Sequence, residues 1–391
     1  MLRAGQILQL VVMALLGLAV VMVHSASMRV GDPAPNPWLS PALIRTAVYA
    51  ALAVAAMFLA SRFDVRELAR NHGWNNPLVW VMVLSLALVV LAMVPHVGAE
   101  INGARRWLRL GPAGWPLTVT FQPSELVKWA MILVIAWWCV SRGDQMHHFG
   151  RGLLPALALL AIACLIIVKE DLGTAALIAG VAVILLLAGG ARWWHLVLMV
   201  PPAAGGVVLA IIHSPYRRAR LTSFLNPFAD ARGTGYQIIQ SLVAIAEGGP
   251  WGRGPGNSMQ KFGYLPSDTT DFIFAVICEE LGVIGAILVV LLYLTFLWVG
   301  LSIVRRCKDP FGKLVVLGVT LTVGLQALIN MAVVTDVVPT KGIALPLVSS
   351  GGTGWIVTAF AIGLVCGIDR AICEEEQMPE QPAQGPTLAP A

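Results

Sequence analysis

Charged residues are scarce in this sequence. Only 12% of its 391 residues are Asp, Glu, Lys or Arg, while 58% are hydrophobic. Soluble domains carry about twice that share of charge, about 25%. The scarcity excludes a soluble globular chain. We expect the protein to lie in a membrane, and we expect no nucleic acid partner.

Histidine is missing from the last part of the chain, and the common catalytic motifs are missing from all of it. No histidine lies beyond residue 213, and no HExxH, paired CxxC, Walker or GxSxG motif occurs. His147 and His148, in "MHHFG", can contact a metal, but we favour a solvated loop. The six cysteines lie in apolar runs or at cytoplasmic ends, so we expect no structural disulfide. No metal site is predicted from these residues.

Long apolar runs are abundant, and a run of about 20 residues crosses a bilayer. They lie at 5–27, 42–63, 78–95, 126–141, 153–168, 172–190, 194–213, 271–304, 313–335 and 354–370. They predict an all-α, multi-pass membrane domain over 1–370, with long outer loops at 96–125 and 214–270. Ten spans put both termini on one side, and the basic residues of the short loops favour the cytoplasm. Residues 371–391, acidic and then Pro-rich, predict a disordered cytoplasmic tail.

The first long loop carries Arg105, Arg106 and Arg109 together with Trp107 and Trp115. Two interpretations stand. The loop is an interfacial anchor of aromatic and basic side chains, or it is a surface for anionic headgroups. One surface can do both.

The motif "QPSELVK" follows that loop. Pro123 fits the first turn of a helix, so Glu125 and Lys128 lie three residues apart on one face. A charged pair at the edge of a span is costly unless it faces protein or water. The pair either fastens the helix mouth or contributes to function.

The first part of the second long loop holds four arginines, and two further signals follow. "GYQIIQSLVAIAEGG" predicts an amphipathic helix along the membrane surface, with Gln240 on its polar side. The glycine-rich "GGPWGRGPGNSMQK" is either a mobile turn or a cradle for phosphate oxygens. The arginines are Arg217, Arg218, Arg220 and Arg232.

Three carboxylates mark the eighth apolar run. Asp271 lies at its start, where the helix dipole favours an acid. Glu279 and Glu280 lie about 12 Å deeper, so at least one is expected to face a polar interior and pair with a cation. Partial burial would raise the pKa of Asp271, and a nearby cation such as Lys128 would lower it.

The last outer segment, "TDVVPTKGIALPLVSSGGTGW", contains Pro339 and Pro346 and paired glycines. It predicts a non-helical dip that lines a cavity, because bare backbone cannot face lipid. Lys341, Ser349 and Ser350 would be its polar contacts.

Together these motifs resemble the SEDS family, the shape, elongation, division and sporulation proteins. The resemblance runs from about Asn102 to Gly367, and it favours the FtsW/SpoVE branch over the RodA branch. It implies a GT-C-like membrane fold. The motifs that carry it are "NGARRWLRLGP", "QPSELVK", "DLGTA", "GYQIIQSLVAIAEGG", "GNSMQKFGYLPSDTTDFIFAVICEELG" and "PTKGIALPLVSSGGT".

The resemblance implies a peptidoglycan glycosyltransferase that polymerises lipid II outside the plasma membrane and releases undecaprenyl pyrophosphate. The family's essential aspartate falls on Asp271, which we expect to act as the base for the GlcNAc 4-hydroxyl. Basic side chains would stabilise the departing diphosphate. The supporting residues expected are Glu125, Lys128, Arg105, Arg106, Arg217, Arg218, Gln240, Glu279, Lys341 and Ser349.

Partners and cofactors follow from the same resemblance. It implies a class B penicillin-binding transpeptidase, with other division or elongation proteins, and a divalent cation (Mg or Mn) can bridge Asp271 and diphosphate. Thr269 and Ser350 stand where the family usually has His and Tyr, and Lys169 and Glu170 also depart from its pattern. A lipid II flippase and a non-catalytic scaffold remain alternatives. A scaffold would not need Asp271, Glu125 and Lys128 to converge.

Overall fold

The computed structural model describes residues 2–27, 40–70, 73–101, 104–110, 119–261, 265 and 269–377. Eight of its helices are long and apolar enough to cross a membrane, and α3 and α6 are apolar but shorter. All ten predicted spans are therefore helices of a multi-pass membrane protein. They are α1 (Ala4–Ala26), α2 (Pro41–Ala60), α3 (Pro77–Met93), α4 (Pro123–Arg142), α5 (Leu154–Val168), α6 (Leu172–Ala188), α7 (Trp193–Ile212), α10 (Ile273–Arg306), α11 (Pro310–Val334) and α12 (Thr353–Gln377).

Many of these helices start at a proline that follows a capping side chain. Ser40 accepts the N–H of Leu43 at the start of α2, and Asn76 accepts that of Leu78 at the start of α3. Proline suits the first turn because its missing N–H would have no partner there, and the cap satisfies another free donor. The sequence therefore fixes these helix starts locally.

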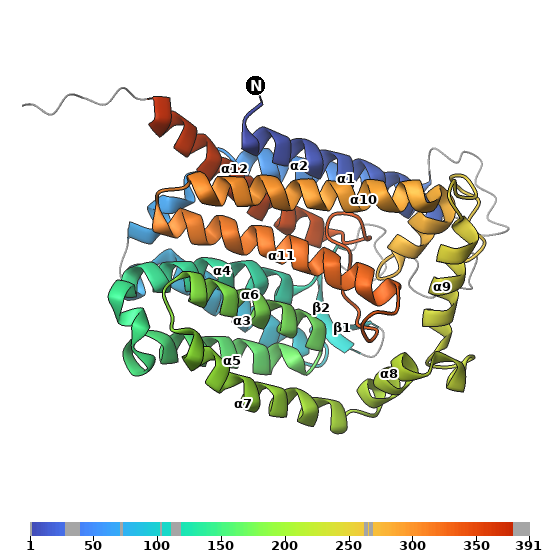
Figure 1. The fold of residues 1–391 in the computed structure, drawn as a ribbon, viewed down its shortest axis with the longest axis horizontal. Helices are drawn as coiled ribbons and strands as arrows, with labels where there is room; N and C mark the ends of the chain where they lie inside the picture. The colour runs from blue at the N-terminus through green and yellow to red at the C-terminus, as the bar shows by residue number, and fades with distance from the viewer. Residues whose placement is uncertain are drawn as a thin grey trace, which may run out of the picture.

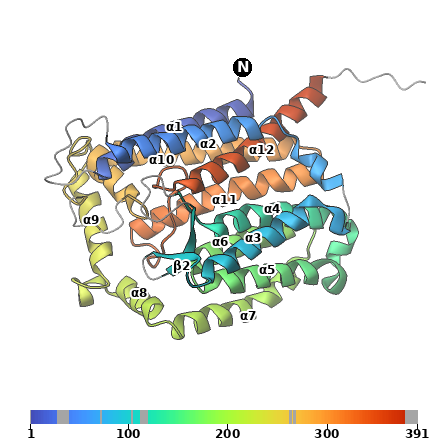
Figure 2. The same cartoon turned by 180° about the vertical axis from the view of Figure 1, so that it is seen from behind.

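Helix α11 lies at the centre of the bundle. It packs against α10 on one side and against α4 and α6 on the other, as Figures 1 and 2 show from opposite faces. α7 lies at the edge of the bundle, and Leu196 is the one buried residue of this helix. α11 carries several buried polar residues, and two of them, Gln326 and Asn330, contribute to the site described below.

The outer loops are folded, and only part of that folding was predicted. Three short strands, β1 (Gly98–Ile101), β2 (Ala104–Leu110) and β3 (Val119–Phe121), form an antiparallel sheet in the order β1-β2-β3. α9 (Tyr236–Gly248) is the predicted amphipathic helix, and it runs across the ends of the long helices (Figure 1). The sheet and α8 (Pro215–Leu225) were not predicted.

Short single-turn helices fill several connections. They are η2 (Val65–Arg70), η3 (Gly73–Asn75), η4 (Gly143–His147), η5 (Phe149–Leu153) and η6 (Pro227–Asp230). η5 is a π-type turn and the others are 3-10 turns. Among them, η4 and η5 join α4 to α5 at the end of the bundle away from the sheet.

The glycine-rich run after α9 packs against α10, and some of its N–H groups are therefore not free to hold phosphate oxygens. Its N–H groups are used within the protein: those of Arg253 and Gly254 donate to the carbonyls of Glu279 and Glu280, each at 2.9 Å. These carbonyls are free because α10 is interrupted at Gly282, which has φ 64° and ψ −160°. The loop therefore docks against a break in the helix.

The tail prediction was wrong for its first residues. α12 continues to Gln377, with Ala371 and Ile372 buried, and Glu375 pairs with Arg66 at 2.9 Å. These seven residues are mostly helix formers, and they still have protein to pack against. Residues 378–391 lie outside the described part of the chain, as does Trp115 of the first loop.

Candidate active site

Asp271 lies two residues before α10, in a backbone held at three consecutive carbonyls. The carbonyl of Thr269 accepts the N–H of Ser350 at 2.8 Å. The carbonyl of Thr270 accepts the Ser349 hydroxyl at 2.6 Å. The carbonyl of Asp271 itself accepts the side-chain amide of Asn330 at 2.8 Å. The position of Asp271 is therefore set by α11 and by the non-helical segment before α12.

The carboxylate of Asp271 lies against the backbone of Gly342. A Cβ atom on Gly342 would be 3.1 Å from Asp271 Oδ2 and 4.0 Å from Arg106 Nη2, so glycine allows both side chains to reach the same point. Arg220 approaches from α8, where its Nη1 donates to the carbonyl of Thr340 at 3.2 Å. One acid and two arginines from three separate segments thus converge beside residues 340–342.

These surroundings shift the proton affinity of the acid. Burial raises the pKa of Asp271 to about 6, while the charges of Arg106 and Arg220 act to lower it and that of Asp171 acts to raise it. Asp271 is nevertheless only half-buried, so the residue keeps some exposed surface. A carboxyl group with a pKa near neutrality is suited to accept a proton.

Arg106 is fixed by the start of α6. Its Nη1 is 3.2 Å from Asp171 Oδ2, and Asp171 caps α6 by accepting the N–H and the hydroxyl of Thr174. The guanidinium is therefore held in place, and its buried Nε is left without a partner among the described residues.

The neighbouring residues Arg105 and Glu170 tie the sheet to the same helix. Glu170 accepts the backbone N–H of Arg105 at 2.9 Å, and the Arg105 side chain pairs with Glu100 at 3.0 Å. Glu170, a departure from the family pattern, thus makes a contact between β2 and the start of α6. The side chain of Arg105 serves the sheet rather than Asp271.

Glu125 and Lys128 form the predicted pair, and they connect to the site through α11. Lys128 is 3% exposed, and its Nζ donates to Glu125 Oε2 at 2.7 Å and to Gln326 Oε1 at 2.9 Å. The amide of Gln326 then donates to the carbonyl of Ala344 at 2.9 Å. The pair therefore supports the segment that carries Gly342. No described contact joins Lys128 to Asp271.

A small hollow borders the site. It measures about 20 Å³ and is lined by Arg105, Arg106, Glu170 and Asp171, among others. This volume holds a water molecule and excludes a sugar. The cavity predicted along the last outer segment therefore stays a prediction. The lack of helix over residues 335–352 of that segment is confirmed.

Glu279 and Glu280 lie away from Asp271, in a buried ionic cluster. Glu280 pairs with Lys261 at 3.1 Å, and both side chains are fully buried. Glu279 accepts the hydroxyl of Ser258 and lies 3.8 Å from an Arg253 nitrogen. Both glutamates pair with cations, as the sequence indicated for at least one. The contacts place Glu279 in the packing of loop 249–261 instead of beside substrate.

Three other expected site residues are also engaged elsewhere or distant. Arg217 donates to the carbonyls of Ala210, Val168 and Lys169, so it joins α8 to the end of α5. Arg218 is exposed on α8. Gln240 is half-buried on α9, and none of the described contacts joins it to Asp271.

Of the predicted polar contacts of the last outer segment, one lies beside the converging charges and one is bonded within the protein. Lys341 is half-buried next to Gly342, beside the converging charges. Ser349 is buried, and its hydroxyl accepts the N–H of Leu345 at 2.7 Å while donating to Thr270. Ser349 therefore shapes the segment and does not face substrate.

Sequence reasoning did not single out Asp171, Gln326 and Asn330. A signal for the last two was present, because Thr322, Gln326 and Asn330 recur every four residues along an apolar helix. Polar side chains at that spacing share one face, and inside a membrane such a face turns toward protein. The signal for Asp171 was its place in "DLGTA", at the start of a span.

Comparison with known proteins identifies the family. Residues 6–373 match the model of the cell cycle proteins FtsW, RodA and SpoVE. The chain is 37% identical to a probable peptidoglycan glycosyltransferase FtsW of Geobacter metallireducens, over 94% of each chain. It is 36% identical to stage V sporulation protein E of Bacillus subtilis, over 93% of this chain and 96% of that protein.

Solved structures agree with the sequence relatives. A chain of a peptidoglycan synthase complex, studied for how polymerization and crosslinking are coordinated, superposes with a TM-score of 0.71 at 30% identity, covering 93% of this chain and 97% of that one. The rod shape determining protein RodA of Thermus thermophilus gives a TM-score of 0.61 at 26% identity, covering 93% and 95%. The motifs, the ten-helix architecture and these relatives agree, and the chain belongs to the SEDS family of FtsW, RodA and SpoVE.

Proposed function

We propose that this protein is a peptidoglycan glycosyltransferase of the cell-division branch of the family. It would polymerise lipid II into β-1,4-linked glycan strands and release undecaprenyl pyrophosphate. The observation that carries the proposal is the convergence of Asp271, Arg106 and Arg220 beside Gly342, at the end of the bundle that holds the folded outer loops. The names of the relatives support the same reaction.

Asp271 is the proposed general base. The 4-hydroxyl oxygen of the acceptor GlcNAc forms a bond to the anomeric carbon of the donor MurNAc, and its proton passes to the carboxylate of Asp271. The bond from that carbon to the diphosphate oxygen breaks, and the configuration inverts. Arg106 and Arg220 would stabilise the negative charge that grows on the leaving diphosphate, which is where preorganised cations accelerate such a step.

The orientation in the membrane is part of the proposal. Lipid-linked sugars are polymerised outside the cell, so the end with Asp271 would be extracytoplasmic, and both termini would be cytoplasmic. The contact between Gly5 and Asp369 supports a common side for the two ends of the chain. A class B penicillin-binding transpeptidase is the expected partner, because a structural relative works in a complex that couples polymerization to crosslinking.

A divalent cation would need ligands from the substrate. Among the described residues, no three His, Cys, Asp or Glu side chains converge at one point. We therefore propose that Mg²⁺ or Mn²⁺, when required, binds mainly through the diphosphate, with Asp271 as the protein carboxylate beside it. Diphosphate oxygens and a carboxylate are suitable ligands for these ions. Chelation with EDTA and re-addition of each metal in the polymerisation assay measures the requirement.

In the decisive experiment, lipid II is added to the purified protein, alone and with its partner transpeptidase. Polymer formation is then compared between variants. Asp271→Asn should fold and form no strand. The matched control is Asp336→Asn, because Asp336 is the other acid at this end with a pKa raised by burial. Its φ of 58° suits asparagine, so the fold should be kept. We expect Asp336→Asn to polymerise normally.

Two outcomes would overturn the proposal. Normal polymer from Asp271→Asn would remove this residue as the base, and loss of activity in Asp336→Asn alone would transfer the role to that acid. Movement of lipid II across liposomes by protein that makes no polymer would favour the transporter alternative instead.

A further inference from the structure

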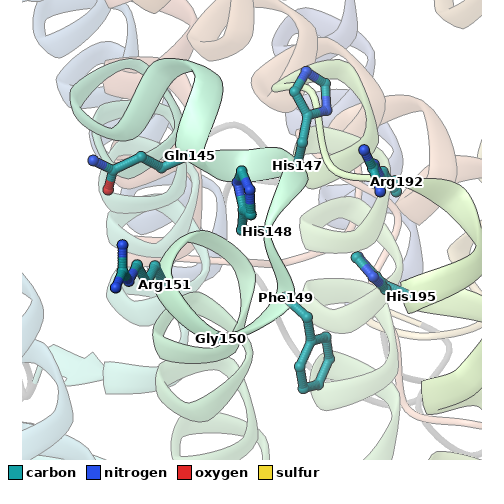
Figure 3. Close-up of a pocket in the computed structure, with 8 residues that line it drawn as sticks. All are labelled: Gln145, His147, His148, Phe149, Gly150, Arg151, Arg192 and His195. Atoms are coloured by element: carbon teal, nitrogen blue, oxygen red, sulfur yellow. The ribbon is translucent and has the colours of Figure 1, made fainter.

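A second pocket lies at the opposite end of the bundle from Asp271. α4 starts near the active site at Pro123 and ends at Arg142, a distance of about 30 Å for its 20 residues. Beyond Arg142, the α4–α5 connection meets the α6–α7 turn, and a cavity of about 480 Å³ lies between them (Figure 3). It is lined by Gln145, His147, His148, Phe149, Gly150, Arg151, Arg192 and His195.

The lining of this pocket is basic. It contains two arginines and three histidines, and no lining residue is acidic. Asp144, on the same turn as His147, does not line it. Figure 3 shows the Arg151 side chain on the α5 side and the Arg192 side chain on the α7 side, with His148 between them. Guanidinium and imidazole N–H groups are hydrogen-bond donors, and such a lining attracts an anion.

His195 adds a second, independent observation on this pocket. Its Nδ1 is buried and has no hydrogen-bond partner among the described residues. The ring is held by aromatic neighbours, with its centroid 5.4 Å from that of Phe149 and 6.0 Å from that of Trp194. A buried polar atom without a partner is costly. A ligand in the pocket can supply that partner once the ring turns Nδ1 toward it.

The two connections that form the pocket are fixed against each other. Trp138 donates to the carbonyl of Gly152 at 2.8 Å, which holds the α4–α5 connection onto α4. In the α6–α7 turn, a Cβ on Gly189 would lie 2.4 Å from Cys139 Sγ, so only glycine permits the close approach to α4. The backbone that carries the donors is therefore fixed before any ligand binds, which lowers the entropy cost of binding.

A metal ion does not fit this lining. Among the described residues the three histidines form no metal-binding group. Figure 3 shows their rings at separate positions around the cavity. Two arginines would also repel a cation. An anion with several acceptor oxygens matches both the charge and the spread of the donors, because each side chain can reach a different oxygen.

We propose that this pocket binds a phosphate group with a net negative charge, at the same end of the bundle as the two termini. A volume of about 480 Å³ admits a group of lipid-headgroup size, since small-molecule sites measure about 300–1,000 Å³. The phosphate belongs either to an anionic membrane lipid or to a soluble phosphate compound. The proposal does not depend on the glycosyltransferase assignment.

Binding here would fasten α7 to the rest of the protein. Arg192 and His195 belong to the start of α7, while His147, His148 and Arg151 belong to the α4–α5 connection. Leu196 is the single buried residue of α7, so this helix has little other packing at that end. A phosphate bridging the two groups of side chains would replace packing with charge-assisted hydrogen bonds.

The test uses the full-length protein in detergent and two probes. Native mass spectrometry measures how much added phosphatidylglycerol is retained relative to phosphatidylcholine, and a thermal shift measures binding of inorganic phosphate. Arg151→Gln/Arg192→Gln should weaken binding of the active probe by about thirtyfold, because one arginine near an anionic surface contributes about fivefold. Arg305→Gln/Lys308→Gln, two exposed basic residues at the same end, should leave it unchanged.

A second variant fills the pocket without removing any positive charge. Gly150→Leu adds a side chain where a Cβ would meet no atom within 4 Å, so it should occupy the pocket while keeping every arginine. We expect it to weaken binding as well. Selective retention of phosphatidylglycerol assigns a lipid headgroup, and stabilisation by inorganic phosphate assigns a soluble ligand. Three outcomes would overturn the proposal. They are equal binding by wild type and both pocket variants, no binding of either probe, and stabilisation by Zn²⁺ alone.

Discussion

The side-chain amide of Asn330 on α11 donates a hydrogen bond to the backbone carbonyl of Asp271 at 2.8 Å, and a second to the carbonyl of Ile343, also at 2.8 Å. One amide thus joins the start of α10 to the segment that carries Gly342. Because Asp271 and Gly342 are the two sides of the candidate active site, Asn330 sets the distance between them.

Asn330→Leu should reduce polymerisation by about a hundredfold, because a displacement of about 1 Å at a reacting group costs that much. Stability should fall by about 1–2 kcal/mol for the two lost hydrogen bonds. The measurements are the rate of lipid II polymerisation and the melting temperature. Thr322→Val is the control on the same helix, since the Thr322 hydroxyl bonds only within α11 among the described residues. Equal rates for the two variants would refute the positioning role.

The rate of polymerisation should rise with pH and level off above about pH 6, the value to which burial raises the pKa of Asp271. Only the ionised carboxylate accepts a proton, so below this pKa the rate should fall about tenfold per pH unit. Arg106→Gln removes a charge that lowers this pKa, and should move the inflection to higher pH. An inflection that stays in place in both Arg106→Gln and Arg220→Gln would show that another group titrates.

Asp271→Asn should be more heat-stable than the wild type at about pH 7.5. The folded protein holds the Asp271 proton more tightly than the unfolded chain, whose pKa is near 3.8. Ionisation therefore costs folding stability as pH rises from about 4 to about 6, and asparagine avoids that cost. The difference in melting temperature should narrow as pH falls toward about 4. A less stable Asp271→Asn at neutral pH would mean that the arginines outweigh burial.

The buried pair of Glu280 and Lys261 should be sensitive to loss of one partner. Glu280→Gln leaves the Lys261 ammonium buried with weaker compensation, and should destabilise the protein by about 3–5 kcal/mol. Lys261→Met/Glu280→Gln should recover most of that loss, since neither charge of this pair is left buried without its partner. Glu374→Gln, in an exposed pair with Arg370, should change the melting temperature little. A double variant as unstable as Glu280→Gln would contradict this account.

Gly282→Ala should destabilise the protein strongly. With φ 64° and ψ −160° the position suits only glycine, and a Cβ there would lie 2.4 Å from the nitrogen of Gly252. The expected change is loss of the contact between loop 249–254 and α10, measured as a lower melting temperature and faster proteolysis of that loop. Gly180→Ala, where a Cβ meets nothing within 4 Å, should be neutral or slightly stabilising. Similar melting temperatures for the two variants would argue against the steric reason.

The spans could be predicted because each depends on a local property, a run of apolar residues closed by a cap or a proline. The sheet of residues 98–121 could not, because its strands are short and its pairing is set by contacts such as that of Arg105 with Glu170. Asp271 and Arg106 came from motifs. The choice of Arg220 over Arg217 depends on which way α8 turns, and sequence spacing does not contain that information.

Glu279 and Ser349 show that a place in a functional motif does not by itself predict contact with substrate. Both lie in motifs that also contain the site, and both were expected to meet substrate. In the structure each is buried and bonded to backbone or loop atoms, because a membrane interior has no water to satisfy a free carbonyl or carboxylate. A polar residue in such a chain is therefore often needed to hold an irregular segment in place.

The three carbonyls at 269–271 have a consequence for biosynthesis. Their hydrogen-bond donors are Asn330, Ser349 and Ser350, which the ribosome adds about 60 to 80 residues after Asp271 itself. A nascent chain that has inserted α10 alone carries the acid without its supports. The candidate site is therefore complete only once the segment before α12 has been added to the chain.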